Sequence, residues 1–305
     1  MRIHHYTSIE TLGLILKNRT IRFNRSDQVD DPDEIELEIN GYPFAKYLLL
    51  SCWTLEEDES IPQWGLYAGK GHGVRITLDS DHLFQNFLSE TRVESRDEII
   101  KKVWEKRFTQ PDGTEIFAYG FHTTSGEKSY VPYYIFHGTF NPTTSGLAIL
   151  PPVPNYEFLT KVDYVNSLDN AYADSINIKN TDERHYSMNF TTRIGYKKRK
   201  SWSFQKEARF ILMLMHTMPQ KSGQIIVDIP DFSFTKYGFP PTSQDRSEQL
   251  FYFDLSVDND AFDYLEVIAG PETSDEEKSK IKDIIQAYAP NAKYSISSCR
   301  TRFNR

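Results

Sequence analysis

The sequence has few cysteines and no long apolar run, and both shortages narrow the class of protein. Cys52 and Cys299 are its only cysteines among 305 residues, too few for a disulfide framework or a structural zinc site. The longest apolar run lies around 48–50, far below the roughly 20 residues that span a bilayer. Since no signal-peptide pattern follows Met1, the sequence predicts a cytoplasmic protein without a membrane segment.

Several catalytic motifs are absent as well. The chain has no Gly-x-Ser-x-Gly elbow, no Walker loop and no His-Glu-x-x-His pair. The glycine turn at 69–73 precedes a predicted strand, so it lacks the helix N-terminus that would hold a pyrophosphate. The net charge of −8 argues against a surface devoted to nucleic acid, although it is compatible with a local basic groove.

Aromatic residues are abundant, at 14% of the chain, and they can fill a core or form the walls of a site for flat ligands. Apolar patterns predict strands at 2–6, 20–23, 45–54, 74–78, 158–165, 207–215, 224–229, 250–256 and 293–298. Helices are predicted after Thr7, in a short segment that carries Trp64 and Tyr67, over 82–90, from Thr181 and over 275–288. Because strands outnumber helices and do not alternate with them, the sequence predicts an α+β fold of mostly antiparallel sheets with a few flanking helices.

The whole chain, 1–305, is predicted to form a single domain. Residues 92–180 show no regular pattern, and we interpret them as a variable insertion or lid. Thr7 and Glu10 predict a capping box at the first helix, and a second capping box opens the helix at 275–288.

The first predicted strand ends at a polar corner, His-His-Tyr-Thr at 4–7. His5, Tyr6 and Thr7 offer an imidazole and two hydroxyls where a strand meets a capped helix, and ligand sites often lie at such corners. A half-buried histidine whose hydrogen bonds are satisfied inside the protein is the plainer and more frequent alternative for His5.

The loop after the second predicted strand carries Asp-Asp-Pro-Asp-Glu at 30–34. Asp31 and Glu34 flank the rigid Pro32 and are its two carboxylates of interest. They could offer the oxygen ligands that Mg²⁺ prefers, but aspartates in turns more commonly cap backbone N–H groups.

Glu207 starts an apolar strand, in the segment Lys-Glu-Ala-Arg at 206–209. A carboxylate at that position is rigid and half desolvated, which suits a base or a partner for developing positive charge. Glu207 and Arg209 also share one face of the strand at period two, so a structural ion pair is an equal alternative.

A basic run at 197–200 precedes this segment and is followed by Trp202 and Phe204. Cations mixed with aromatics suit a nucleic-acid backbone and stacked bases. The solvated C-terminus of the helix predicted from Thr181 explains the same run more simply, because cations favour that end of the helix dipole.

These segments together resemble the domain of unknown function 2971 family. The matching segments are His-Tyr-Thr-Ser at 5–8, Ile-Leu at 15–16, Asp-Asp-Pro-Asp-Glu at 30–34, Cys-Trp-Thr at 52–54, Trp-Gly-Leu-Tyr-Ala at 64–68, Gly-Val at 73–74, Trp202 with Lys-Glu-Ala-Arg at 206–209, and Val-Ile-Ala-Gly at 267–270. The chain departs from the family pattern at Asp30, where asparagine is usual, and at 205–206, where the first glutamate of a pair is usual. The resemblance covers nearly the whole chain and is loosest over 92–180.

A strand-end histidine, a mid-chain tyrosine and a late glutamate are also similar in order to the His-Tyr-Glu set of ADP-ribosyltransferases. That resemblance implies a split sheet and an NAD⁺-consuming transferase or NAD⁺ glycohydrolase. It assigns Glu207 to the oxocarbenium character that develops at the ribose, and to the ribose hydroxyls. It assigns His5 to the adenosine-side ribose.

The same resemblance assigns Tyr67 or Trp64 to stacking on nicotinamide, and Arg22 or Arg209 to the pyrophosphate. The expected binding set is completed by Tyr6, Thr7, Asp31 and Glu34. NAD⁺ is then a substrate, no metal is expected, and a protein or nucleic acid is the acceptor of any transferred group. A toxin or phage-defence effector is a natural setting for such a reaction.

Two alternatives belong to other classes of protein. A Mg²⁺-dependent nucleic-acid hydrolase would use Asp31, Glu34 and Glu207 for the metal and the run at 197–200 for the backbone. A non-catalytic sensor would bind a nucleotide or peptide in the same pocket without turnover, so that ligand stabilises the protein but stays unchanged.

Overall fold

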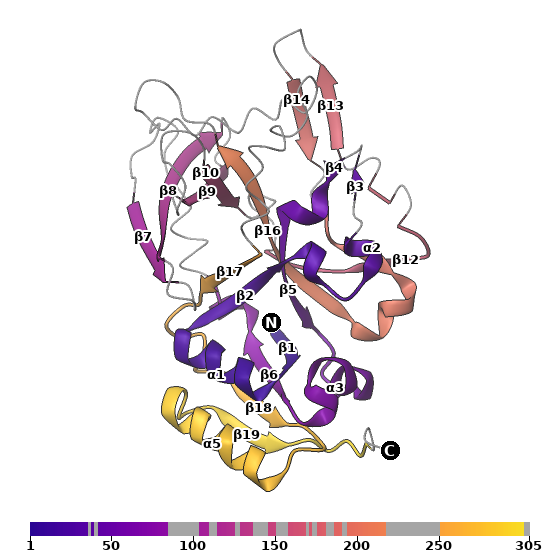
Figure 1. Ribbon diagram of the computed structural model, residues 1–305, viewed down its shortest axis with the longest axis vertical. Helices are drawn as coiled ribbons and strands as arrows, with labels where there is room; N and C mark the ends of the chain where they lie inside the picture. Colours follow the sequence, from indigo (N-terminus) through magenta and orange to yellow (C-terminus); the bar gives the residue numbers. More distant parts are fainter. Residues whose placement is uncertain are drawn as a thin grey trace.

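The computed structural model places the terminal parts of the chain and a series of strands between them (Figure 1). The described residues are 1–35, 38–39, 42–84, 104–109, 115–125, 129–136, 146–150, 158–168, 171–172, 176–180, 186–190, 194–217 and 251–301. Side chains are described for 1–34, 45–84, 158–168, 171–172, 194–212 and 251–301.

One sheet of thirteen strands organises this part of the chain, in the main order β19-β18-β6-β1-β5-β16-β10-β9-β8-β7, with β2, β11 and β17 beside it. Its strands are β1 (Arg2–Thr7), β2 (Thr20–Arg25), β5 (Leu48–Thr54), β6 (Val74–Asp79), β7 (Trp104–Thr109), β8 (Glu115–Ser125), β9 (Ser129–Phe136), β10 (Gly146–Leu150), β11 (Leu159–Lys161), β16 (Glu207–Thr217), β17 (Tyr252–Ser256), β18 (Glu266–Ala269) and β19 (Lys293–Ile296). Its described pairings are antiparallel, apart from the parallel pair β18–β19. The predicted α+β class with a mostly antiparallel sheet is confirmed.

The remaining elements are small. In the part of the chain that the structure describes, three strand pairs stand apart from the main sheet: β3 (Glu38–Ile39) with β4 (Tyr42–Pro43), β12 (Asp163–Val165) with β15 (Lys197–Arg199), and β13 (Ile176–Asn180) with β14 (Tyr186–Phe190). The α-helices within the described residues are α1 (Ile9–Asn18), α2 (Pro32–Ile35), α3 (Ile61–Tyr67) and α5 (Asp275–Tyr288). Short 3₁₀ turns cover Ser26–Gln28, Phe44–Tyr47, Gly69–Gly71, Ser80–His82 and Lys200–Gln205. Within the described residues, no helix combines the length and the apolar character needed to cross a membrane.

β5 is the strand at which the sheet divides. β16 pairs with one edge of β5 along its whole length. On the other edge, β1 pairs at a single register position, His4 opposite Thr54, whereas β2 pairs at 49–50. Residues 51–53 therefore have no partner strand on that edge within the described part of the chain, and a gap opens between β1 and β2.

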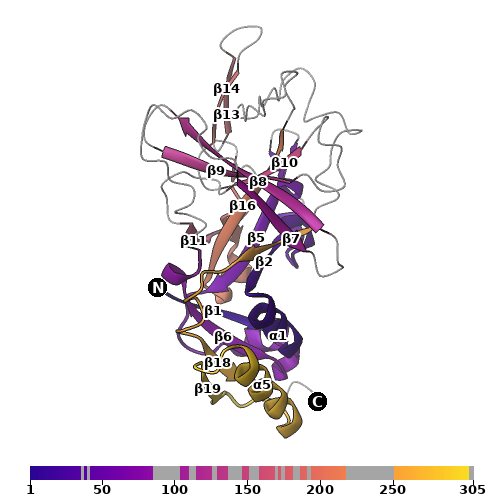
Figure 2. The same ribbon diagram turned by 90° about the vertical axis from the view of Figure 1, so that its left-hand side faces the viewer.

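Two helices cover one face of the sheet around β1, β6 and β18, and they lie side by side at the same end of the molecule (Figures 1 and 2). The side chains that α1 buries are Ile9, Leu12, Ile15 and Leu16. α5 adds Ile281 and Ile285 to the same core. At the surface Lys280 binds Glu10 at 2.8 Å and joins the two helices.

α3 covers the opposite face. Trp64 of this helix packs edge to face against Tyr6 of β1, with 4.8 Å between ring centroids, and Ala68 completes a small separate cluster. Because side chains alternate along a strand, Tyr6 points towards α3 while His5 points towards the α1 side. Neighbouring residues of β1 thus serve opposite faces of the sheet.

Of the two predicted capping boxes, the one at the last helix is confirmed and the one at the first helix is wrong. Ser274 and Glu277 form the expected capping box on α5. α1 is capped by Ser8, whose Oγ accepts the Thr11 N–H at 3.1 Å. Thr7 is instead the last residue of β1, because its backbone pairs opposite Val74 of β6.

The middle of the chain contains more strand than the sequence indicates. The helix expected from Thr181 is wrong, since β14 and β15 occupy part of that stretch. β7, β8, β9 and β10 continue the main sheet, because β10 pairs with β16. The lid role of 92–180 stays a prediction. The strand expected at 224–229 and most of the helix expected at 82–90 lie outside the described residues.

Candidate functional site

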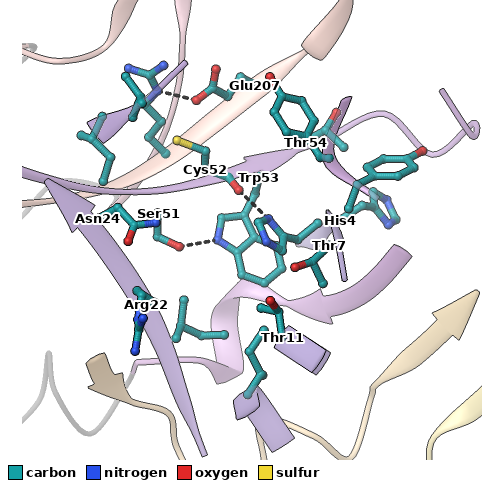
Figure 3. Close-up of a pocket in the computed structure, with 18 of the residues that line it drawn as sticks. His4, Thr7, Thr11, Arg22, Asn24, Ser51, Cys52, Trp53, Thr54 and Glu207 are labelled. Atoms are coloured by element: carbon teal, nitrogen blue, oxygen red, sulfur yellow. Dashed lines mark hydrogen bonds and ion pairs between the residues drawn. The ribbon is translucent and has the colours of Figure 1, made fainter. Parts of the chain in front are cut away.

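A cavity of about 500 Å³ lies at the gap where β1 and β2 separate from β5, a volume typical of small-molecule pockets. Its walls come from β1, α1, β2, β5, α3, β17 and the segment 198–209. Its polar side chains include His5, Thr7, Thr11, Arg22, Asn24, Tyr67, Lys198, Gln205, Glu207, Arg209 and Asp254. Figure 3 shows Glu207 on one side of Cys52 and Trp53, with Arg22 and Thr11 on the other.

The open edge of β5 forms one wall of this cavity. The carbonyl of Cys52 points into the gap and accepts the Nδ1–H of His5 at 2.9 Å. The indole N–H of Trp53 donates to Ser51 Oγ at 3.0 Å (Figure 3). In a strand the N–H and C=O of one residue point to the same edge, so the amide of Cys52 faces the gap beside His5.

His5 is held as a neutral hydrogen-bond acceptor. Its bond to the Cys52 carbonyl places the proton on Nδ1 and leaves the lone pair of Nε2. Burial lowers the pKa of the His5 imidazole, against the opposing effect of that backbone bond. The ring of Trp53, 5.2 Å away between centroids, supports the imidazole from the side.

Glu207 belongs to a buried cluster of four charges. Its Oε1 accepts the Nε–H of Arg209 at 2.5 Å, which confirms the structural ion pair predicted as one alternative. Arg209 also binds Glu34, at 2.7 and 2.8 Å. Lys198 closes the ring, because its Nζ lies 3.2 Å from an oxygen of Glu34 and 3.2 Å from Oε2 of Glu207. Two positive and two negative charges therefore balance within the protein.

The balance of the four buried charges determines the protonation state of Glu207. Burial by itself would raise the pKa of the carboxyl, but Arg209 and Lys198 outweigh it and lower the pKa to about 2. Burial would likewise lower the pKa of the Lys198 ammonium, but Glu207 and Glu34 raise it. Glu207 is thus a permanent carboxylate at neutral pH, suited to stabilising a cation and poorly suited to accepting a proton.

Asp31 and Cys52 lie beside the cluster. Burial raises the pKa of the Asp31 carboxyl, although its Oδ1 accepts the Asp33 N–H at 3.1 Å. That bond confirms the capping role predicted for the acidic loop. Burial also raises the pKa of the Cys52 thiol well above its usual range, with the charge of Glu207 adding to the effect. Cys52 is therefore a poor nucleophile.

Tyr67 reaches the cavity from α3. The side-chain amide of Gln205 donates to its hydroxyl, and Gln63 holds Gln205 through the backbone carbonyl at 3.2 Å. Burial, with the charges of Asp30 and Glu207, raises the pKa of the Tyr67 phenol above its usual range. The phenol therefore stays protonated and presents a fixed ring and hydroxyl to the cavity.

Several residues expected in the site do not line the cavity. Trp64 is fully buried and donates its indole N–H to Glu59 at 3.0 Å, so it presents no face to a ligand there. Asp31 and Glu34 lie behind the cavity wall. Tyr6 and Thr7 do line it, but the hydroxyl of Tyr6 accepts the Ser60 N–H at 2.8 Å on the α3 side.

Arg22 lines the mouth and is already paired. Its Nε and Nη2 donate to the carboxylate of Asp254 at 2.8 and 2.9 Å. Its guanidinium lies over the ring of Tyr252, 3.8 Å from the centroid. The arginine is thus well oriented, but its charge is neutralised by Asp254.

The residues named for a metal site do not form one. Within the described residues no group of three His, Cys, Asp or Glu side chains is placed to hold a metal ion. Glu34 and Glu207 are two of the three expected ligands, and their carboxylate oxygens already bind Arg209 and Lys198. The donor set that the hydrolase alternative requires is therefore engaged elsewhere.

The sequence did not reveal two important residues of the site. Lys198 belongs to the basic run interpreted as a solvated helix end or a nucleic-acid contact, yet it is 6% exposed and part of β15. Trp53 was noted only within a family motif. A lysine in a three-residue strand between a half-buried and an exposed cation carries no sequence pattern that indicates burial.

No known protein family, curated protein or solved structure matches this chain in comparisons of sequence and fold. The resemblance to the domain of unknown function 2971 family therefore stays a prediction from the sequence motifs.

Proposed function

We propose that the protein consumes NAD⁺, cleaving the bond between nicotinamide and ribose and passing the ADP-ribosyl group to water or to a protein or nucleic-acid acceptor. The proposal rests on the convergence of three side chains on one cavity. His5, Tyr67 and Glu207 are separated by most of the chain, and all three line one cavity of ligand size. The division of the sheet at β5 is the feature that we relate to the split sheet of ADP-ribosyltransferases.

The chemistry assigned to these residues follows from their charge states. When the glycosidic bond breaks, its electron pair leaves with nicotinamide, whose ring loses its positive charge. The ribose then carries oxocarbenium character, which the carboxylate of Glu207 stabilises. Since Glu207 has a pKa of about 2, it acts by charge and leaves the proton of the attacking group to solvent or to the acceptor.

The other two residues bind and orient. Nε2 of His5 accepts a hydrogen bond from a ribose hydroxyl, because Nδ1 is committed to the Cys52 carbonyl. The ring of Tyr67 offers an aromatic face for nicotinamide, and Gln205 keeps its hydroxyl in place. Tyr67 replaces Trp64 in this role, since Trp64 does not reach the cavity.

The test is release of nicotinamide from NAD⁺ by purified protein, with cell lysate as a source of acceptors and EDTA in place of metal. We expect Glu207→Gln to reduce release by roughly 100-fold or more, the size of effect seen when a preorganised electrostatic group is removed. The product is followed by chromatography, so that hydrolysis and transfer are distinguished.

Glu34→Gln is the matched control, because Glu34 shares Arg209 and Lys198 with Glu207 but does not line the cavity. Both variants break the same buried cluster, and only one removes the carboxylate facing the ligand. Equal losses in the two variants, or release unaffected by Glu207→Gln, contradict the proposal.

A second function is favoured by the full engagement of Glu207. Since both of its oxygens bind cations, the cavity could serve a sensor that binds a nucleotide without turnover. The sensor predicts a higher midpoint of thermal unfolding with NAD⁺ and no nicotinamide release.

A further inference from the structure

The cavity holds a cation, Lys198, to which the proposed reaction assigns no role. Lys198 lines the cavity, its side chain is 8% exposed, and its ammonium lies 4.9 Å from the centroid of the Trp202 ring. Within the described residues its charged partners are Glu34 and Glu207, which leaves one of its three N–H donors without a carboxylate.

The contacts of Lys198 are weaker than those of its neighbour. Its ammonium is 3.2 Å from each carboxylate, longer than the roughly 2.7–2.9 Å of a strong charge-assisted hydrogen bond. Arg209 binds the same two carboxylates at 2.5 to 2.8 Å and also donates to the Gly195 carbonyl at 2.7 Å. Of the two cations, Lys198 is the one that a competing anion can attract.

The other arginine at the cavity is less available. Arg22 donates twice to Asp254, at 2.8 and 2.9 Å, and lies over Tyr252. A phosphate that approached Arg22 would also meet the carboxylate of Asp254. Lysine is furthermore a compact charge on a flexible stem, so its ammonium can turn between partners without moving the backbone.

We propose that Lys198 is the phosphate-binding residue of the cavity, and that the pyrophosphate of the substrate draws its ammonium away from Glu207. This inference rests on the proposed function and deepens it. Oε1 of Glu207 stays bound to Arg209, while Oε2 becomes available to the ribose. The substrate thereby unmasks the carboxylate that acts on it, and Lys198 is a binding and positioning residue.

The surroundings of Glu207 are consistent with such an exchange. The groups that face it are Arg209 on its own strand, Lys198 on β15, Cys52 on β5, Tyr164 on β12, Tyr67 on α3 and Glu34 on α2. Arg209 and Lys198 are the cations in this set. When Lys198 turns to a phosphate, Arg209 still holds the carboxylate in place, and the developing positive charge of the ribose supplies the second partner.

The experiment compares two substrates, NAD⁺ and nicotinamide riboside, which lacks phosphate but has the same scissile bond. We expect Lys198→Met to reduce kcat/KM for NAD⁺ by roughly 10- to 100-fold, the loss of one charged hydrogen bond. Cleavage of the riboside is expected to be unchanged or faster, because Oε2 no longer needs a phosphate to free it. Lys198→Arg should restore part of the activity on NAD⁺.

The possible results distinguish a failure of the role of Lys198 from a failure of the proposed function. Losses of the same factor on both substrates, or an unchanged rate on NAD⁺, overturn the role of Lys198 while the proposed function stands. Lys200→Met, at an exposed neighbour outside the cavity wall, controls for a general loss of positive charge. If the wild-type protein cleaves neither substrate, the proposed function fails. In that case, thermal unfolding with inorganic pyrophosphate tests the phosphate-binding role of Lys198. Equal stabilisation of the wild type and of Lys198→Met overturns that role.

Discussion

Glu207 and Glu34 show how the position of a side chain, more than its chemistry, separates a residue with a proposed function from a structural one. Both carboxylates are buried and both bind Arg209 and Lys198. Breaking such a cluster by removing one partner leaves an uncompensated charge, which is costly in a buried site. Only Glu207 faces the cavity, so its activity and its stabilising effect can be separated by comparison with Glu34.

Trp64 is the residue whose predicted role changes most, and this leads to a prediction about stability. Its side chain is fully buried and packs against Tyr6. We expect Trp64→Ala to lower the free energy of unfolding by about 3–5 kcal/mol, as for other buried aromatic truncations. Urea unfolding followed by far-UV circular dichroism measures the change.

Leu66→Ala is the matched control for this prediction, because Leu66 lies on the same helix and is 57% exposed. A change within about 0.5 kcal/mol is expected there. A Trp64→Ala protein as stable as the Leu66→Ala protein would contradict the burial described for Trp64 and reopen its role as a ligand-stacking surface.

At the scale of elements, the ends of β1, β6 and α3 lie close together. Their contact requires a residue without a side chain at position 73. A Cβ on Gly73 would lie 2.2 Å from the carbonyl oxygen of Thr7 and 3.0 Å from Ala68. These are backbone and helix-end atoms that cannot yield without moving β1. The register that brings His5 to the cavity thus relies on a residue outside it.

Gly73→Ala is therefore expected to destabilise the protein by about 3 kcal/mol or more, through a steric clash that shifts β1. The midpoint and slope of urea unfolding give the change in free energy. If the proposed function holds, the same variant should bind NAD⁺ more weakly, since His5 and Thr7 move with the strand.

Gly13→Ala provides the comparison within α1. Its Cβ would lie 3.6 Å from Ile284, an ordinary contact, and alanine favours a helix over glycine by up to about 1 kcal/mol. We expect a neutral or stabilising effect. A loss at Gly13 equal to that at Gly73 would show that general sensitivity to substitution, and not the contact with Thr7, explains the result.

At the scale of the whole molecule, buried ionisable groups link folding to pH. Burial, with the charges of Arg75 and Arg2, lowers the pKa of His4 to about 3, so its 3.4 Å contact with Glu57 is not an ion pair at neutral pH. The pKa of Glu207 is lowered to about 2, as is that of Glu266, which accepts hydrogen bonds from Arg2 and Lys293. In all three cases the unfolded chain takes up a proton at a higher pH than the folded protein does.

Stability should therefore fall as the pH falls, first between about 6.5 and 3 through His4, then below about 4.5 through the two carboxylates. For His4 the loss amounts to about 3 kcal/mol by pH 4, at about 1.4 kcal/mol per pKa unit. Urea midpoints measured from pH 7 to pH 4 give the slope. His4→Gln is expected to flatten the upper part of this dependence, and an unchanged slope would contradict the assignment.

Sequence patterns predicted the local parts of this structure well. The strand at 2–6, the buried strand within 45–54, and the helix at 275–288 with its cap all depend on short-range periodicity and capping. The convergence of His5, Tyr67 and Glu207 on one cavity agrees with the motifs singled out in the sequence. Local chemistry at strand ends marked His5 and Glu207, whereas Tyr67 was singled out through the resemblance to ADP-ribosyltransferases.

The sequence could not predict the features that depend on distant contacts. Lys198 is buried because Glu34 and Glu207 arrive from other parts of the chain to neutralise it. Trp64 does not reach the cavity because it packs against Tyr6 and Ala68 and donates its indole N–H to Glu59. The helix expected from Thr181 failed for a similar reason, since strand pairing, as between β13 and β14, overrides local preference.

The order in which the cavity is assembled has a consequence for the cell that makes the protein. Its walls begin with β1 near the N-terminus and end with Asp254 of β17. β17 pairs with β2 and places Asp254 opposite Arg22 at the mouth. A ribosome that has translated the first 250 residues has therefore not yet produced the complete cavity wall, and under the proposed function a nascent or prematurely terminated chain would lack the full site for NAD⁺.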